Sequence, residues 1–343
     1  MPAQMAQWMK ALRADSLSWL LEEDEACPGV RYFALTQLLD DRTDGKPAKA
    51  ALRAVMKSGP VPDILARQRP DGGWGANLYG AKYKGTVWSV ISLWQTGADP
   101  GDARVKLGCE TAFDLSMNPA GVLAVYATGN SYIHCMSGNL VAALYALGFS
   151  RTQQLVRATE AMCRMVTGDG VAPVGSKDKS ALRYMKSTTP GPGFRCVANG
   201  GLPCGWGAAR VLLALAAMPE ARRSQLHINA LDQTVEFLLS RDPAIADYPT
   251  ATNPSSSWQN FGFPLFYITD YLSVLEGLAL AGYVKDQRVT HAVDAMLAKQ
   301  DAQGRWKREH APRSPVGFNP GRVGQPNKWV TLRALRVIKA WAS

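Results

Sequence analysis

Two stretches of this sequence decide the fold: ILARQRPDGGWG (residues 64–75) and MLAKQDAQGRWK (residues 296–307). In each, an apolar residue lies four positions before a glutamine, and Gly-x-Trp follows after three further residues. The matching positions are Gln68, Gly72 and Trp74 in the first copy and Gln300, Gly304 and Trp306 in the second. Each copy is followed by a loop and a further apolar window that contains a tryptophan. Self-similarity of this kind predicts an architecture of stacked, repeated units.

The rest of the chain has the pattern of one helix after another. Apolar residues recur at intervals of three and four, which is typical of amphipathic helices. Glycine and proline gather between these windows and predict the connections. The windows cover residues 8–21, 87–94, 140–147, 208–215, 231–239, 271–280 and 330–341. The pattern predicts an all-α protein.

The two stretches match the QW motif of squalene and oxidosqualene cyclases and resemble the Gly-Trp turns of protein prenyltransferase β subunits. Four other segments are similar to bacterial proteins described as squalene-cyclase-like or as prenyltransferases: KYKGTVWSVISLWQTG, HCMSGNLVAALYALGF, FGFPLFYITDYLSVLEGLALAGY and KWVTLRALRVI. The resemblance to this terpenoid cyclase and prenyltransferase superfamily covers most of the chain from about residue 28. It implies one α/α toroid domain over residues 1–343, a barrel of paired inner and outer helices. In that fold the glutamine and tryptophan tie the end of an outer helix to the next inner helix.

One departure from the family pattern bears on activity. Class II cyclases protonate their substrate with an Asp-x-Asp-Asp motif, and this sequence contains none. Residues 40–44 (DDRTD) fit the Asp-Asp-x-x-Asp pattern that binds magnesium diphosphate in class I terpene synthases. They also fit a solvated helix end, because Gly45 and Pro47 follow directly.

Composition narrows the class of protein. With 47% hydrophobic and 19% charged residues, the chain suits a soluble globular protein. No apolar run reaches the 18 to 20 residues of a membrane span, and the N-terminus lacks the features of a signal peptide. The net charge of +10 comes from scattered Lys and Arg residues, which argues against nucleic acid as a partner and is compatible with a cavity that attracts an anionic substrate. Six cysteines without a secretory signal predict a cytoplasmic protein with free or metal-bound thiols.

Three of the cysteines lie in connections rich in glycine or proline. In a toroid the inner helices run parallel, so their N-termini surround one mouth of the ring. Cys135 and Cys204 directly precede expected inner helices, and Cys196 lies in the loop that leads to Cys204. The fold therefore predicts that the three thiols meet at this mouth. Cys27, Cys109 and Cys163 lie inside helical apolar patterns and are expected in the core.

A three-cysteine cluster at helix N-termini has the chemistry of a zinc site. The unpaired N–H groups and the dipole of a helix N-terminus favour the thiolate, which is the form that binds metal. Three ligands and an open fourth position are typical of catalytic zinc. His134 is a candidate fourth ligand. A single catalytic thiol, or cysteines without a chemical role, are the alternatives.

Further residues are expected at the same mouth. We predict Asp270 and His310 as catalytic acid–base groups, since one lies at the start of an expected inner helix and the other in the loop after the second QW stretch. An aromatic set and one lysine near the expected starts of the inner helices are predicted to bind a partly apolar substrate. These residues are Trp88, Trp206, Trp258, Phe266, Tyr267, Tyr271 and Lys328.

The sequence thus predicts a zinc-dependent hydrolase that acts on a small, partly apolar and in part anionic molecule in a central cavity. Zinc lowers the pKa of bound water toward about 7 and polarises a carbonyl or phosphoryl oxygen. Two alternatives stay open. One is an isoprenoid enzyme, either a cyclase or a prenyltransferase, and the other is a non-catalytic toroid that binds a ligand.

Overall fold

The computed structural model describes residues 7–41, 43–125, 132–172, 182–183, 192–253 and 255–343. Its α-helices are α2 (Ser16–Leu21), α3 (Pro28–Phe33), α4 (Lys46–Val55), α5 (Pro60–Leu65), α6 (Thr86–Thr96), α7 (Ala103–Ser116), α8 (His134–Leu144), α9 (Gln153–Thr167), α10 (Gly205–Ala217), α11 (Gln225–Leu239), α12 (Tyr271–Ala281), α13 (Thr290–Ala298) and α14 (Lys328–Ala342). Short π-helical turns, η2 (Ala34–Leu38) and η3 (Tyr145–Phe149), extend α3 and α8. Short 3-10 helices are η1 (Met9–Ala11), η4 (Val197–Asn199), η5 (Glu220–Arg222), η6 (Ser256–Trp258) and η7 (Gln287–Val289). Two two-residue strands, β1 (Val171–Ala172) and β2 (Leu182–Arg183), pair in parallel.

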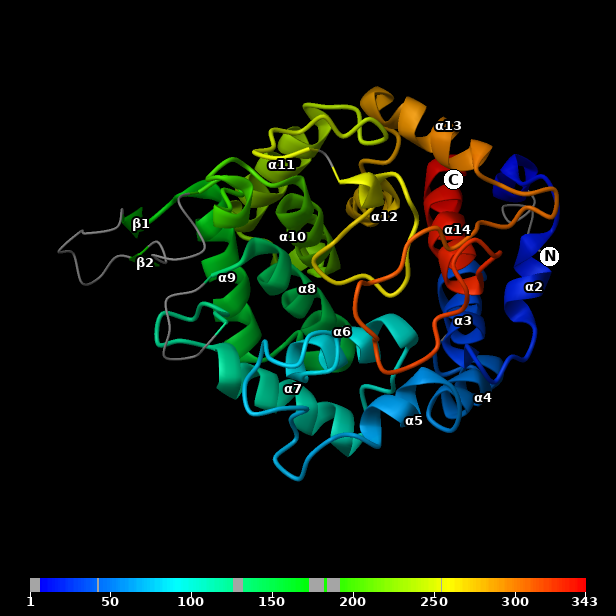
Figure 1. The fold of residues 1–343 in the computed structure, drawn as a ribbon, viewed down its shortest axis with the longest axis horizontal. Helices are drawn as coiled ribbons and strands as arrows, with labels where there is room; N and C mark the ends of the chain where they lie inside the picture. The colour runs from blue at the N-terminus through cyan, green and yellow to red at the C-terminus, as the bar shows by residue number, and fades with distance from the viewer. Residues whose placement is uncertain (1–6, 42, 126–131, 173–181, 184–191, 254) are drawn as a thin grey trace.

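The helices form a closed ring of two layers (Figure 1). Within the described residues, six helices make the inner layer: α3, α6, α8, α10, α12 and α14. Each of these packs against an outer helix, in the pairs α3–α4, α6–α7, α8–α9, α10–α11, α12–α13 and α14–α2, and α5 also packs against α6. The ring closes where α14 meets α3 and η2. The prediction of an all-α toroid is confirmed. None of the described helices combines the length and hydropathy of a membrane span.

The two layers differ in their hydrophobic pattern for a physical reason. An outer helix such as α9 buries one face, along which Leu155, Met162 and Val166 lie, and exposes the other. An inner helix such as α10 is covered by helices on both sides, so its residues from Gly207 to Leu212 are all buried. A helix that is apolar on every side is expected only in such a position.

The two QW stretches form turns with the same geometry. The indole Nε1 of Trp74 donates to the carbonyl oxygen of Ile64 at 2.7 Å, and that of Trp306 donates to Met296 at 2.8 Å. Each tryptophan backbone N–H donates to a threonine hydroxyl of the next inner helix at 3.0 Å, in α6 and α14 respectively. Gly72 and Gly304 both have a positive φ angle, which a side chain would strain. The predicted structural role of the motif, a tie between an outer turn and the next inner helix, is confirmed.

A third turn of this kind has a different sequence. The hydroxyl of Tyr248 donates to the carbonyl oxygen of Leu238 at 2.6 Å, across the ten-residue separation that both tryptophans use. Asp242 lies six residues before Tyr248, where the other turns have glutamine, and its carboxylate contacts His291 of the next outer helix. The turn thus keeps its contacts although it has lost the motif.

One detail differs from the sequence-based expectation. Residues 8–21 do not form one helix: η1 ends at Ala11 and α2 begins at Ser16, because the carboxylate of Asp15 accepts from the backbone N–H of Ser18 and caps a new helix. In the Asp-Asp-x-x-Asp pattern, Asp40 pairs with Lys339 of α14 at 2.6 Å, while Arg42 lies outside the described residues.

A segment without regular structure crosses the centre of the ring. This central segment, residues 259–270, runs between α11 and α12 and occupies the middle of the ring (Figure 1). Side chains of four inner helices bind its backbone. Gln95 of α6 both accepts from and donates to Leu265, Asn139 of α8 donates to Phe266 O at 2.6 Å, Arg210 of α10 donates to Ile268 O at 3.1 Å and Arg333 of α14 donates to Gly262 O at 2.8 Å. Buried irregular backbone requires such partners.

Candidate functional site

The three cysteines predicted as metal ligands meet at the mouth formed by the inner-helix N-termini. Cys204 is the N-cap residue of α10, Cys135 lies in the first turn of α8, and Cys196 is the N-cap residue of η4. Gly207 lies between the two helices: a Cβ there would stand 3.9 Å from both Cys204 Cβ and Cys135 N. The placement of the cysteines at this mouth agrees with the sequence-based prediction.

Backbone N–H groups surround the sulfur atoms. Ala198 and Asn199 donate to the Sγ of Cys196, and Gly207 donates to the Sγ of Cys204. The hydrogen bond from Cys204 lowers the pKa of Cys196 to about 6 and raises the pKa of Cys204. Burial raises the pKa of Cys135 to about 12. The pair Cys196–Cys204 therefore carries one negative charge near neutral pH, and Cys135 stays a neutral thiol while no cation is bound.

The thiols do not already have the arrangement of a metal site. In the part of the chain that the structure describes, no three His, Cys, Asp or Glu side chains are placed to hold a metal ion together. His134, the candidate fourth ligand, is 4% exposed and packs between Tyr132 and Phe194. Within the part of the chain that the structure describes, neither of its ring nitrogens has a hydrogen-bond partner, and burial lowers its pKa to about 3. The neutral imidazole is the form that binds a metal, but zinc binding itself stays a prediction.

An aromatic cluster covers the same mouth. Tyr83 stacks on Phe266 with ring centroids 4.7 Å apart, and Trp88 meets Tyr79 at 4.9 Å and Phe266 at 5.4 Å. Tyr267 completes the cluster and hydrogen-bonds to Tyr83 at 3.2 Å between the two hydroxyls. Of the predicted substrate-binding set, this cluster brings together Trp88, Phe266 and Tyr267.

Tyr79 was not singled out from the sequence, yet it lies beside the thiols. Burial raises the pKa of its phenol, and charge on Cys135 and on Cys196 raises it further. A phenol with a raised pKa holds its proton at neutral pH and is able to donate a hydrogen bond. The loop that carries it, residues 75–85, has no hydrophobic period that would place a side chain, so only the structure reveals this contact.

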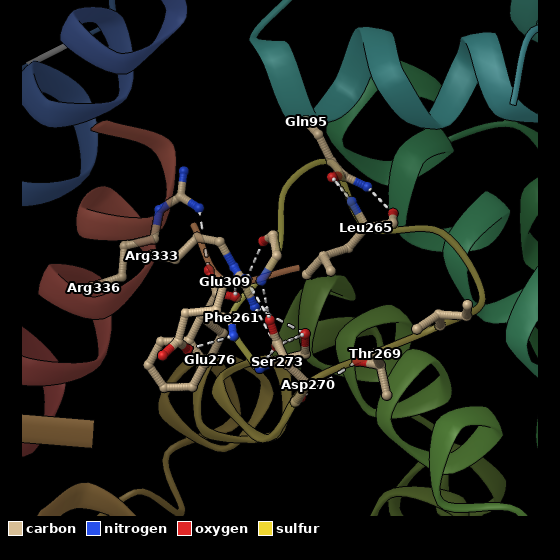
Figure 2. A network of polar contacts seen from close by, with 12 residues as sticks. Gln95, Phe261, Leu265, Thr269, Asp270, Ser273, Glu276, Glu309, Arg333 and Arg336 are labelled. Carbon is tan, nitrogen blue, oxygen red and sulfur yellow. Dashed lines mark hydrogen bonds and ion pairs between the residues drawn. The ribbon is translucent and has the colours of Figure 1, made fainter. Parts of the chain in front are cut away.

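Asp270 has a different environment from the one expected of a general base. Its carboxylate caps α12 by accepting from the backbone N–H of Ser273 at 2.9 Å, and it forms a two-point ion pair with Arg333 at 2.8 and 2.9 Å (Figure 2). The N–H of Gly262 and the hydroxyl of Ser273 donate to the same carboxylate. Although burial alone raises its pKa, Arg333 and these donors together hold the pKa of Asp270 below its ordinary value. With both oxygens engaged, its contacts are structural, and a catalytic role stays an untested prediction.

His310 lies in the loop between α13 and α14, beside the central segment. Its backbone N–H donates to Phe261 O at 3.2 Å, and its Nε2 is buried without a hydrogen-bond partner. Burial lowers its pKa, while the charge of Asp270 acts in the opposite sense. It is thus a neutral imidazole near neutral pH, and its catalytic role also remains a prediction.

The other predicted substrate-binding residues lie apart from the aromatic cluster. Trp258 donates from Nε1 to Pro243 O at 2.7 Å in the third turn, and Tyr271 packs edge-on against Phe261. Lys328 pairs with Glu22 and Asp24 at 3.2 and 3.1 Å, and lies over the ring of Trp19. Trp206 is partly buried against the core. Their roles in substrate binding are untested.

A cavity of about 470 Å³ lies toward the other end of the ring, where the inner helices end. Phe263 and Leu265 of the central segment line it. Its remaining walls come from α3, α6, α10, α12 and α14 and are mostly aliphatic and aromatic. The charged residues of the wall are Arg210, Glu276, Arg333, Arg336 and Lys339. This size and this lining are typical of small-molecule sites.

The charged wall was also missed from the sequence, although it left a signal there. Arg210 lies in the otherwise apolar helix α10, and Arg333 and Arg336 lie among the apolar residues of α14. A charged residue on a helix that is apolar all round has to be buried, and buried charges are paired or bind ligands. Figure 2 shows the resulting network, in which Glu276 pairs with Arg333 at 2.7 Å and with Arg336 at 3.4 Å.

Comparisons with known proteins give likeness at the level of the fold. No family model matches this chain, and neither does any curated protein. Among solved structures, the chain is similar to an unsaturated glucuronyl hydrolase specific for heparin (13% identity over 93% of this chain and 86% of that one, TM-score 0.48) and to the unsaturated glucuronyl hydrolase of Bacillus sp. GL1 (12%, 98% and 93%, TM-score 0.46). It is also similar to the type II terpene cyclase MstE from Scytonema (14%, 82% and 95%, TM-score 0.32). Identities and scores this low carry no conclusion about activity.

Proposed function

We propose that this chain is a hydrolase that acts on a small, partly apolar molecule and that it uses zinc held by Cys135, Cys196 and Cys204. The observation that supports this proposal is the placement of three cysteines at the starts of α8, α10 and η4, with backbone N–H groups donating to two of the sulfurs. Such donors stabilise thiolates. Zinc binding requires side chains of the cluster to rotate and Cys135 to lose its proton.

Each group at the mouth has a role in this proposal. When bound, zinc would supply a Lewis acid that polarises a carbonyl or phosphoryl oxygen. The Tyr79 phenol, which holds its proton, donates a hydrogen bond to the substrate. The rings of Trp88, Phe266 and Tyr267 pack against its apolar part and exclude water. Asp270 keeps α12 and the central segment in position through Arg333 and Gly262.

The first test is metal content. The protein purified without chelators is expected to contain about one zinc per chain by inductively coupled plasma mass spectrometry. Cys196→Ser is expected to lower the zinc content by more than half and to abolish turnover of chromogenic ester, phosphate and glycoside panels. Cys163→Ala is the matched control, because Cys163 is a buried cysteine of the core, and its zinc content should equal that of the wild type. A metal-free wild-type protein, or full activity without all three cysteines, contradicts the proposal.

The second test addresses proton donation. Tyr79→Phe removes the hydroxyl and keeps the ring that packs on Trp88. We expect it to retain zinc and to lower kcat by about 10²- to 10³-fold, which is the usual contribution of one hydrogen-bond donor to transition-state stabilisation. Loss of zinc in this variant would instead mean that the phenol supports the metal site.

The isoprenoid alternative has one observation in its favour. The cluster of Tyr83, Trp88, Phe266 and Tyr267 offers π faces of the kind that stabilise a carbocation. Release of pyrophosphate from allylic diphosphates, without hydrolysis of the chromogenic panels, would favour this alternative over the hydrolase.

A further inference from the structure

The cavity at the far end of the ring contains a buried arginine that has no ion-pair partner among the described residues. Arg210 is 1% exposed and lines the cavity. Within the described residues its side chain forms no ion pair, and its one hydrogen bond runs from Nη2 to Ile268 O at 3.1 Å. Its Nε is buried and has no hydrogen-bond partner.

The neighbouring arginine shows what a satisfied guanidinium looks like in the same wall. Arg333 forms ion pairs with both Asp270 and Glu276 and also donates to Ser273 and Gly262. Both carboxylates are therefore already paired with Arg333. Arg336 shares Glu276 at 3.4 Å, and its own Nε is likewise buried without a partner.

A buried cation without an ion-pair partner lowers the stability of a folded protein. The effective penalty of burying an unpaired ion is several kcal/mol. Burial lowers the pKa of Arg210 to about 10, which still leaves it charged at neutral pH. The charges of Asp270 and Glu276 offset part of this cost, but both carboxylates are held in ion pairs by Arg333. Three arginines of the wall thus face two carboxylates, and an anion bound in the cavity would compensate the remaining positive charge.

The apolar walls define the rest of the ligand. Phe33, Trp94, Leu213 and Leu332 line the cavity beside the arginines. At its edge, where α12 ends, Leu280 is 58% exposed. The lining of the cavity thus runs from a buried, positively charged residue, Arg210, to an exposed apolar residue, Leu280, at the edge.

We propose that this cavity binds a small amphiphile that has one anionic group, a carboxylate or a phosphate, on an apolar body. The anionic group lies against Arg210, and the apolar body extends along the aromatic and aliphatic wall toward Leu280. The cavity is lined mainly by the C-terminal parts of the inner helices, whereas Arg210 lies six residues after Cys204 on α10 and its charge acts on Cys135. Zinc content is therefore also measured in the Arg210 variants, and amphiphile binding in Cys196→Ser, so that failure to bind zinc and failure to bind the amphiphile are distinguished.

The experiment is calorimetric titration of the wild-type protein with decanoate and with decyl phosphate, each below its micelle concentration. Both ligands are expected to bind with a stoichiometry near one. Decanol, decyltrimethylammonium and inorganic phosphate are the controls, since each lacks one part of the proposed chemistry. We expect each control to bind at least about 10-fold more weakly, because a hydrogen bond to a charged group contributes about 10- to 100-fold in affinity.

The decisive variant is Arg210→Met, which keeps the aliphatic part of the side chain and removes the charge. It should weaken decanoate binding by about 10- to 100-fold. Because it also loses the hydrogen bond to Ile268 O, circular dichroism is used to show that the variant is folded. Arg53→Met, on the exposed face of α4, is the matched control and should bind as the wild type does. Arg210→Lys keeps the charge and should retain measurable binding, which tests the site even if Arg210→Met folds poorly.

Three results would overturn the proposal. They are wild-type affinity in a folded Arg210→Met variant, equal affinity for decanol and decanoate, and no binding of either amphiphile to the wild-type protein. Equal binding of inorganic phosphate and decyl phosphate would overturn its apolar part. If decyl phosphate alone binds, the ligand is an organic phosphate, whereas preferential binding of decanoate identifies a carboxylate.

Discussion

At the scale of single residues, the protein contains a buried pair of opposite charges whose partners depend on each other. Asp270 and Arg333 are 1% and 4% exposed and contact each other through two oxygens and two nitrogens. A buried pair of this kind contributes little compared with two apolar residues, but removing one partner leaves a charge without compensation. Its contribution to stability is therefore measured by replacing one residue of the pair and leaving the other in place.

Asp270→Asn is expected to destabilise the fold by about 3 to 5 kcal/mol, because Arg333 loses a charged partner. Urea unfolding at pH 7 measures the change, and Asp114→Asn on the exposed face of α7 is the control. The effect also depends on pH. The folded-state pKa of Asp270 lies below its ordinary value, so its contribution is complete above about pH 4 and is lost as the pH falls toward the depressed pKa. The stability gap between wild type and variant should therefore shrink at pH 3; a constant gap, or one below about 1 kcal/mol at pH 7, contradicts this assignment.

Sequence reasoning was successful for residues at helix ends and failed for charges in helix interiors. Cys135 and Cys204 were placed at one mouth because the expected starts of the inner helices carry them there. Arg210 lies in a helix interior, where its position among apolar residues indicates burial but not a partner; its hydrogen-bond partner, Ile268 O, lies in the central segment, far away in the sequence. Asp270 was located correctly at a helix start, but the pattern could not reveal that Arg333 already occupies its carboxylate.

At the scale of elements, the repeated QW motif lies in the turns between outer and inner helices. Trp74 is 6% exposed and Trp306 is fully buried, and each indole spans ten residues to a helix-end carbonyl. The same carbonyls also accept from the backbone N–H groups of Arg67 and Lys299, so each indole adds a second hydrogen bond at the helix end. The turn thus combines apolar burial with satisfaction of a helix end.

Trp74→Ala and Trp306→Ala are each expected to destabilise by about 3 to 5 kcal/mol, from the lost burial and the cavity left behind. Denaturant unfolding measures both values. Trp341→Ala, near the C-terminus and only partly buried, should cost less. Losses below about 1 kcal/mol at both turn positions would show that the turns do not hold the ring together.

The limits of prediction from sequence are also clear at this scale. Two turns were found because glutamine and tryptophan recur at fixed spacing. The third was missed because Asp242 and Tyr248 make equivalent contacts with different side chains. The central segment was missed for another reason: hydrophobic periodicity identifies helices, but it does not reveal that the irregular stretch between two of them folds inward.

At the scale of the whole molecule, the ring makes the helices depend on each other. Neighbouring inner helices pack on one another from α6 through α14 and from α14 to α3, each also packs against an outer helix, and several bind the central segment. The prediction of one domain over residues 1–343 follows from this interdependence. Differential scanning calorimetry should show a single transition whose calorimetric and van't Hoff enthalpies agree. Two resolved transitions, with or without bound ligand, would contradict it.

The closure of the ring has a mechanical consequence. The first and last helices of the chain lie side by side, α14 against α2, α3 and η2, and Lys339 and Lys328 bridge this seam to Asp40, Glu22 and Asp24. A force that pulls the two chain ends apart therefore acts first on this seam. The packing of α6 to α12 does not bear this force while the seam is intact. Under load the ring is expected to open first at the contacts of α14 with α2, α3 and η2. The remaining helix packing is expected to persist until these contacts have broken.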